Sequence, residues 1–179
     1  MSSSWVFVTS NPNKWQEAQR ILGYAIQRTE LDLEEVQAES VAAVALAKAQ
    51  AAFAALQCPV IVEDAGIELH GLGGFPGPFI KYWEKLGGLA SICRAADGLG
   101  DRRVRAVCAL GICSENGAEV IQGSVDGLLS LHPRGSNGFG WDAIFVPQGE
   151  GRTFGEMTAA EKDARSHRRK AWELLRDRL

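Results

Sequence analysis

The chain has 179 residues, of which 46% are hydrophobic and 23% charged, a composition typical of one soluble globular domain over residues 1–179. Its formal net charge of −3 argues against broad nucleic-acid binding, which needs a basic surface. The length is sufficient to bury a sizeable core.

Cysteine usage and the hydrophobic runs predict a cytoplasmic protein. The cysteines at 58, 93, 108 and 113 form no Cys-x-x-Cys pair and are interpreted as core residues in a reducing compartment. Residues 1–4 carry no basic segment, and the apolar run after them is short, so no signal peptide is expected. The run from Val41 to Leu56 is interrupted by Lys48 and Gln50 and is too short for a membrane span.

The first half of the chain alternates strands and helices. We expect short strands over residues 5–8, 25–29 and 60–62, the last ending on Glu63-Asp64. We expect helices over 14–22, which ends at Gly23, and over 41–56, which Ser40 caps.

The second half is predicted to begin with a Gly/Pro-rich segment over residues 71–78 and short helices over 79–86 and 89–96. Long strands over 103–113 and 119–131 surround Asn116-Gly117, a strong hairpin signal. A loop and strand over 138–146 and an amphipathic helix over 167–178 follow. This order predicts an α/β fold with a central mixed sheet flanked by helices on both faces.

Two features of the first half suggest polyanion and metal chemistry. The loop Thr9-Ser10-Asn11-Pro12-Asn13-Lys14 joins a strand to a helix, where α/β folds place anions, although it lacks the Walker pattern and also fits an ordinary turn. Glu63-Asp64 offers oxygen ligands for a divalent cation, but an Asp at a strand end is also common.

Charge is unevenly distributed along the chain. Residues 30–39 are acidic and residues 162–170 are basic, so the two segments could bind a metal–polyanion complex, although solvated faces are more common. The glycines and prolines of residues 73–78 allow close approach of the backbone to a ligand, and Lys81 follows them. Lys48 is either a phosphate-binding cation or a surface residue that snorkels, with its stem along the helix and its ammonium in solvent.

Two segments of the second half suggest base recognition. In Phe139-Gly140-Trp141-Asp142, either aromatic residue could stack on a base while Asp142 accepts from ring N–H groups; core packing is the alternative. Ser166 stands at an N-cap position, which places His167 and Arg168 in the first turn of the last helix. They either bind an anionic or carbonyl-rich ligand or belong to a basic surface helix.

Taken together, these motifs resemble the inosine triphosphate pyrophosphatase family, nearly from end to end. The similarity is carried by Thr9-x-Asn11-x-x-Lys14, the acidic segment Leu33–Glu35, Val62-Glu63-Asp64, Gly74-x-Pro76-Gly77-Pro78-Phe79-Ile80-Lys81, Phe139-Gly140-Trp141-Asp142, Glu156-Met157, Glu161-Lys162 and Ser166-His167-Arg168. The Pro-Gly-Pro and Phe-Gly-Trp-Asp sequences look closest to its eukaryotic-type branch.

The resemblance implies an elongated ITPase-like fold with two lobes, an active-site cleft between them, and a homodimer. It implies Mg²⁺-dependent hydrolysis of non-standard purine nucleoside triphosphates (ITP, dITP, XTP) to the nucleoside monophosphate and pyrophosphate. Water attacks the α-phosphorus in this reaction. No nucleic-acid or membrane partner is expected.

The resemblance also assigns roles to residues of this sequence. Glu35 and Asp64 would hold Mg²⁺, although Glu34 competes with Glu35 for this role. Asp64, Lys14 and Lys48 would be catalytic. The substrate would be bound by Thr9, Ser10, Asn11, Pro12, Asn13, Lys14, Lys48, Glu63, Lys81, Phe139, Gly140, Trp141, Asp142, Lys162, Ser166, His167 and Arg168.

Within that set, Lys14, Lys48, Lys81 and Lys162 would hold the triphosphate, while His167 and Arg168 would donate to the 6-oxo group of the base. Adenine presents an amino group at that position and would be rejected. Two other functions stay open: a nucleotide pyrophosphatase with dUTP or broad specificity, and a non-catalytic nucleotide-binding protein.

Overall fold

The structure is a computed structural model that describes residues 5–178. Its strands are β1 (Val6–Val8), β2 (Gln27–Thr29), β3 (Val60–Leu69), β4 (Pro76–Gly77), β5 (Arg103–Ser114), β6 (Gly117–Leu129) and β7 (Phe145–Pro147). Hydrogen bonding orders them β2-β1-β3-β5-β6-β7, with β4 beside β3. Strand β1 is parallel to β2 and β3, whereas β4 and β7 are antiparallel to their neighbours. The sheet is therefore mixed, as predicted.

The helices are α1 (Pro12–Leu22), α2 (Val41–Leu56), α3 (Ile80–Gly87), α4 (Leu89–Leu99), α5 (Ala159–Asp163) and α6 (His167–Arg176), and the 3-10 turns are η1 (His70–Leu72), η2 (Gly140–Ala143) and η3 (Phe154–Glu156). The described chain divides into two compact units. The first contains residues 5–64, 108–123 and 168–178, and the second contains residues 65–107 and 124–167. Strands β3, β5 and β6 contribute residues to both units.

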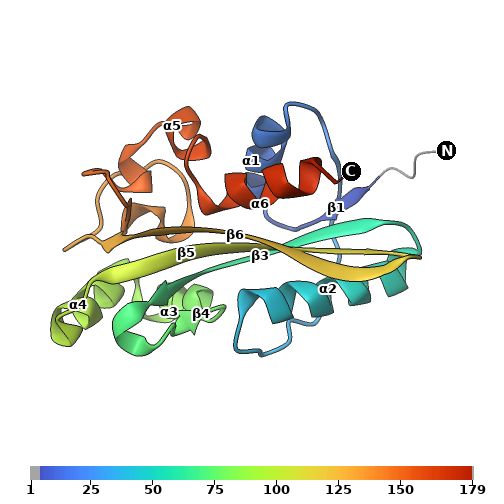
Figure 1. The fold of residues 1–179 in the computed structure, drawn as a ribbon. Helices are drawn as coiled ribbons and strands as arrows, with labels where there is room; N and C mark the ends of the chain where they lie inside the picture. Colours follow the sequence, from blue (N-terminus) through green and yellow to red (C-terminus); the bar gives the residue numbers. More distant parts are fainter. Residues whose placement is uncertain (1–4, 179) are drawn as a thin grey trace. The chain divides into compact units, whose positions relative to one another are not determined.

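In the first unit, α1 and α6 cover one face of the strands and α2 covers the other (Figure 1). The core under α1 and α6 includes Phe7 and Trp172, whose rings meet edge to face at 5.0 Å. Ser40 caps α2 by accepting the Ala43 N–H, as predicted. The helix lies directly on β5, because Gly111 has no side chain to keep it away.

In the second unit, α3 and α4 lie on one face of the strands, and the segment containing α5 lies on the other (Figure 1). Its core includes Ile80 of α3 and Ile92 of α4, together with Phe145 of β7 and Phe154 of η3. The rings of these two phenylalanines lie 5.0 Å apart between centroids. The core of this unit thus fixes the segment that contains residues 139–142.

Several element boundaries differ from the expectation. The strand expected over residues 60–62 was too short, because β3 continues to Leu69, where Ile67 and Glu68 pair with β4. Glu63-Asp64 therefore lies inside a strand and not at its end. Helix α1 begins earlier than expected, at Pro12, because proline suits the first helical turn. The sequence did not indicate α5, which is only five residues long.

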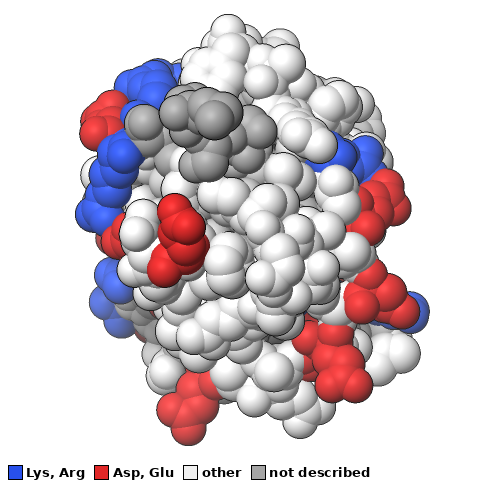
Figure 2. Space-filling model, turned by 90° about the vertical axis from the view of Figure 1, so that its right-hand side faces the viewer, with Lys and Arg blue, Asp and Glu red and all other residues white. Residues whose placement is uncertain are grey.

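The surface shows no extended patch of one charge on the face drawn in Figure 2, where most Lys, Arg, Asp and Glu side chains lie toward the rim. Among residues 5–178, every helix is too short or too polar to cross a membrane.

Candidate active site

The β1–α1 loop is tightly capped. The Asn11 side chain accepts the N–H groups of Asn13 at 2.9 Å and Lys14 at 3.4 Å, which is the N-cap arrangement of α1. The Thr9 hydroxyl accepts the Asn11 N–H at 3.1 Å. The loop therefore satisfies three of its own N–H groups, and their predicted use in phosphate binding stays a prediction.

Lys14 joins this loop to β3. Its ammonium donates to the Glu63 carbonyl at 3.2 Å and lies 3.4 Å from a carboxylate oxygen of the same residue. Since its side chain is 19% exposed, the ammonium remains partly accessible to solvent. The first turn of α1 thus brings a cation to the strand that carries Asp64.

Lys48 lies between the two carboxylates predicted to bind metal. Its ammonium is paired with Glu35 and lies 3.5 Å from Asp64 Oδ1. Only 17% of the Lys48 side chain is exposed, and its predicted contact with phosphate stays a prediction. Of the two candidate glutamates, Glu35 takes part in this cluster, whereas Glu34 is exposed.

Asp64 is a buried carboxylate with 8% of the residue exposed. Burial raises its pKa above the ordinary value of 3.8, an effect opposed by Lys14 and Lys48. Among the described residues, its buried Oδ2 has no hydrogen-bond partner. A buried oxygen of this kind suits a hard cation or a water molecule.

Glu35 and Asp64 fit the predicted Mg²⁺. Magnesium is commonly held by one or two carboxylates together with substrate phosphates and water. Within residues 5–178, no group of three or more His, Cys, Asp or Glu side chains could hold a metal ion. The protein thus supplies two carboxylates here, and further ligands would come from substrate and solvent.

Arg168 is the centre of a buried ion cluster in the first unit. Its Nε and Nη2 donate to Glu63 at 2.9–3.1 Å, and its Nη1 pairs with Glu17 on α1. The Trp172 indole N–H also donates to Glu63, at 3.3 Å. Burial would lower the pKa of the Arg168 guanidinium, but Glu63 and Glu17 raise it well above its ordinary value.

The alternative of a basic surface helix is wrong for this turn, since Arg168 is 2% exposed and His167 is 1% exposed. Sequence analysis did not single out Glu17. A signal was present, because Glu17 stands one turn before Ile21 on the inner face of α1, where a carboxylate needs a partner. Whether Arg168 also donates to a base stays a prediction.

In the second unit, Asp142 is buried. Its Oδ2 accepts the Phe139 N–H at 2.8 Å and the Lys162 ammonium at 2.5 Å. Gly138 is required here, because a Cβ at that position would lie 2.1 Å from Asp142 Oδ2. The Lys162 ammonium also lies 4.7 Å from the centre of the Phe139 ring. Lys162, which is predicted to bind the triphosphate, therefore contacts two residues that are predicted to bind the base.

Trp141 and His167 form an aromatic pair in the same unit, with ring centroids 5.1 Å apart. Trp141 is 8% exposed, so it is the aromatic of this segment that packs in the core, whereas Phe139 is half-buried. Ser166 is also buried. The sequence did not indicate Glu84 of α3; burial, and then the charge of Asp142, raises its pKa.

Lys81 stands in the first turn of α3, as expected, and is exposed, with its ammonium 5.2 Å from the centre of the Tyr82 ring. The predicted residues thus form two groups. The first unit holds Thr9, Ser10, Asn11, Pro12, Asn13, Lys14, Glu35, Lys48, Glu63, Asp64 and Arg168; the second holds Lys81, Phe139, Gly140, Trp141, Asp142, Lys162, Ser166 and His167.

A buried carboxylate with a raised pKa beside two lysines is typical of a functional site. The model of the Ham1 family matches residues 5–178. The chain belongs to the Ham1 family.

An archaeal relative and a fungal relative show the same sequence identity to this chain. It is 38% identical to the dITP/XTP pyrophosphatase of Hyperthermus butylicus over 93% of this chain and 89% of the relative. It is also 38% identical to the inosine triphosphate pyrophosphatase of Batrachochytrium dendrobatidis over 97% of this chain and 93% of the relative.

Solved structures show the same fold. A HAM1 protein from Coxiella burnetii superimposes with a TM-score of 0.86 and 26% identity, over 98% of this chain and 97% of its own. A nucleoside-triphosphatase / dITP/XTP pyrophosphatase from Mycobacterium abscessus gives a TM-score of 0.76 and 30% identity, over 96% of this chain and 98% of its own.

Proposed function

We propose that this protein hydrolyses the non-standard purine nucleoside triphosphates ITP, dITP and XTP to the nucleoside monophosphate and pyrophosphate. The observation that carries the proposal is the cluster of Lys14, Lys48, Glu35 and Asp64. It combines cations suited to a triphosphate with carboxylates suited to a divalent cation. The printed names of the relatives support the same substrates.

In this proposal Glu35 and Asp64 would hold Mg²⁺, which when bound would neutralise phosphate charge. Asp64 orients the attacking water and accepts its proton, a role for which burial and a raised pKa suit a carboxylate. The water forms a bond to the α-phosphorus, and the bond from that phosphorus to the bridging oxygen of the leaving pyrophosphate breaks. Lys14 and Lys48 stabilise the charge that develops on pyrophosphate.

The remaining predicted residues divide between phosphate and base. The loop Thr9–Asn13, Lys81 and Lys162 are assigned to the triphosphate. Residues 139–142, with Ser166, His167 and Arg168, are assigned to the base. A buried acceptor such as Asp142 and donors such as His167 would favour a 6-oxo purine, which presents a ring N–H and a carbonyl.

Three further parts of the proposal rest on the resemblance: dependence on Mg²⁺, a homodimer, and a cytoplasmic location. Of these, the pair of carboxylates beside Lys48 supports the first.

The test is a substrate panel of ITP, dITP, XTP, dUTP, GTP and ATP with Mg²⁺, in which nucleoside monophosphate and pyrophosphate are quantified together. We expect the three non-standard purine nucleotides to have the highest kcat/KM. Equal turnover of dUTP or of all the nucleotides would favour the broader pyrophosphatase. Binding without pyrophosphate release would favour a non-catalytic nucleotide-binding protein.

A further inference from the structure

Arg28 of β2 holds the loop that follows β1. Strand β2 runs parallel to β1, with Arg28 in register with Phe7. The Arg28 side chain donates from Nε to the Thr9 carbonyl at 3.0 Å and from Nη2 to the Ser10 carbonyl at 3.4 Å. The Thr9 N–H donates to the Thr29 carbonyl at 3.0 Å. Strand β2 therefore binds both the N–H and the C=O of Thr9.

The guanidinium is itself held in place. It is paired with Glu30 and lies 5.9 Å from the centre of the Trp15 ring on α1. The Trp15 indole N–H donates to the Ile26 carbonyl at 2.9 Å, which fixes the ring against the residue that precedes β2. The Arg28 side chain is only 21% exposed. These contacts leave the guanidinium little freedom.

The arrangement decides which polar groups the loop presents. Carbonyl oxygens carry partial negative charge and repel phosphate oxygens, so an anion-binding loop needs its carbonyls engaged elsewhere. Arg28 engages those of Thr9 and Ser10 and adds a positive charge beside them. We propose that Arg28 is a positioning residue that holds the Thr9–Asn13 loop in the conformation that binds the substrate triphosphate. This inference rests on the proposed function.

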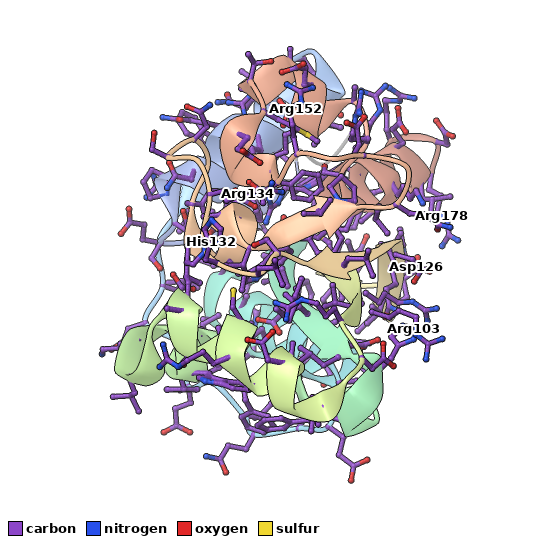
Figure 3. All side chains as sticks on the ribbon, turned by 90° about the vertical axis from the view of Figure 1, so that its left-hand side faces the viewer. Arg103, Asp126, His132, Arg134, Arg152 and Arg178 are labelled. Carbon is purple, nitrogen blue, oxygen red and sulfur yellow. The ribbon has the colours of Figure 1, made fainter. Side chains whose placement is uncertain are left out.

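The planar fork of arginine is essential to this role, because one lysine ammonium lacks the rigid geometry that spans two neighbouring carbonyls. Arg28→Lys keeps the charge and loses the fork, and Arg28→Gln loses both. Arg178→Gln is the matched control: it removes an arginine of the same unit from an exposed ion pair with Glu119. Figure 3 shows Arg178 projecting outward at the edge of the molecule.

The first measurement is amide hydrogen exchange of Thr9, Ser10, Asn11 and Asn13 without substrate. We expect both Arg28 variants to exchange there at least about tenfold faster, equivalent to about 1.4 kcal/mol of lost protection, while Arg178→Gln matches the wild type. Unchanged exchange in both Arg28 variants overturns the inference. Wild-type exchange in Arg28→Lys alone also overturns the inference, because a positive charge without the planar guanidinium would then be enough to hold the loop.

The second measurement is calorimetric binding of inorganic triphosphate with Mg²⁺, together with kcat and KM for ITP and ATP. We expect both Arg28 variants to bind triphosphate about tenfold more weakly and to raise KM for both nucleotides, with kcat and the ITP/ATP preference nearly unchanged. If wild type and variants bind triphosphate equally well, only the Arg28 inference fails. If the wild type neither binds triphosphate nor releases pyrophosphate, the proposed function fails as well.

Discussion

Asp64 combines burial with proximity to two lysines, and these have opposite effects on its ionisation. Burial dominates and raises its pKa above 3.8, so the folded protein holds this proton more tightly than the unfolded chain. Protonated Asp64 therefore stabilises the folded protein at a pH below 3.8, its ordinary pKa in the unfolded chain. This stabilisation is lost as the pH rises through the higher pKa that Asp64 has in the folded protein. At neutral pH the ionised Asp64 therefore lowers the free energy of unfolding of the protein without metal or substrate.

We expect Asp64→Asn to lose about 10²-fold or more in kcat for ITP at any Mg²⁺ concentration, because the proposed base and metal ligand is gone. The same variant should be more stable than wild type at pH 7, and the difference should narrow as the pH falls toward 3.8. Thermal unfolding without metal or nucleotide from pH 7 down to pH 4 measures this second effect. The exposed Glu34→Gln is the control, and near-normal kcat in Asp64→Asn would refute the catalytic assignment.

Arg168 depends on two carboxylates that come from different elements. Glu63 and Glu17 are 6% and 4% exposed, so neither could remain ionised in this position without a cation beside it. Removing one partner from a buried ion cluster costs more than the cluster contributes as a whole, because the remaining charges stay buried and unpaired.

The variant Arg168→Met should therefore lower the free energy of unfolding by about 3–5 kcal/mol in urea. Adding Glu17→Gln and Glu63→Gln should recover most of this loss, since the buried charges are then absent. Arg169→Met, which removes a half-exposed pair with Glu173, should cost less than about 1 kcal/mol. If Arg168→Met and Arg169→Met lower the free energy of unfolding equally, burial of the Arg168 cluster does not determine its contribution to stability.

Among the elements, α2 and β5 approach each other closely at Gly111. A Cβ on Gly111 would lie 2.2 Å from the Ala45 carbonyl oxygen and 3.1 Å from the Ala49 side chain. This contact needs small residues on both elements, and α2 supplies Ala45 and Ala49 there. The helix also carries Lys48 of the candidate site.

Gly111→Ala should destabilise the protein by about 1–3 kcal/mol, because the backbone of α2 must move away from β5. Gly98→Ala in α4 is the matched substitution, since a Cβ there meets nothing within 4 Å. It should stabilise the protein by about 0.5–1 kcal/mol, through the higher helix propensity of alanine. Chemical denaturation of both variants compares them directly, and the same sign of change in both would contradict this account.

The elements themselves were largely predictable. Helix α2 follows from Ser40 and the apolar run after it, and the β5–β6 hairpin follows from Asn116-Gly117, where Gly117 adopts a φ of 119°. The C-terminal part of β3 was missed because Ala65-Gly66 does not continue an apolar run. Its pairing with β4 depends on residues 76–77, which are adjacent only in the fold.

At the scale of the whole molecule, the predicted site residues occur in both compact units, and the family model matches all described residues, 5–178. The homodimer is a prediction from the resemblance. Light scattering after gel filtration should give twice the chain mass of 19.3 kDa over a range of concentrations, and the mass of one chain would refute the dimer.

The sequence alone determined the fold class, the order of the motifs and the start of the last helix at His167. These depend on local periodicity, capping and turn chemistry, all of which act over a few neighbouring residues. Only the tertiary structure decided the partners of the ionisable groups. Arg168 meets Glu63 and Glu17 across 105 and 151 residues of sequence, and Lys48 meets Glu35 and Asp64. Such pairs form because burial removes water from charged groups and requires a counter-charge, and packing determines which one is within reach.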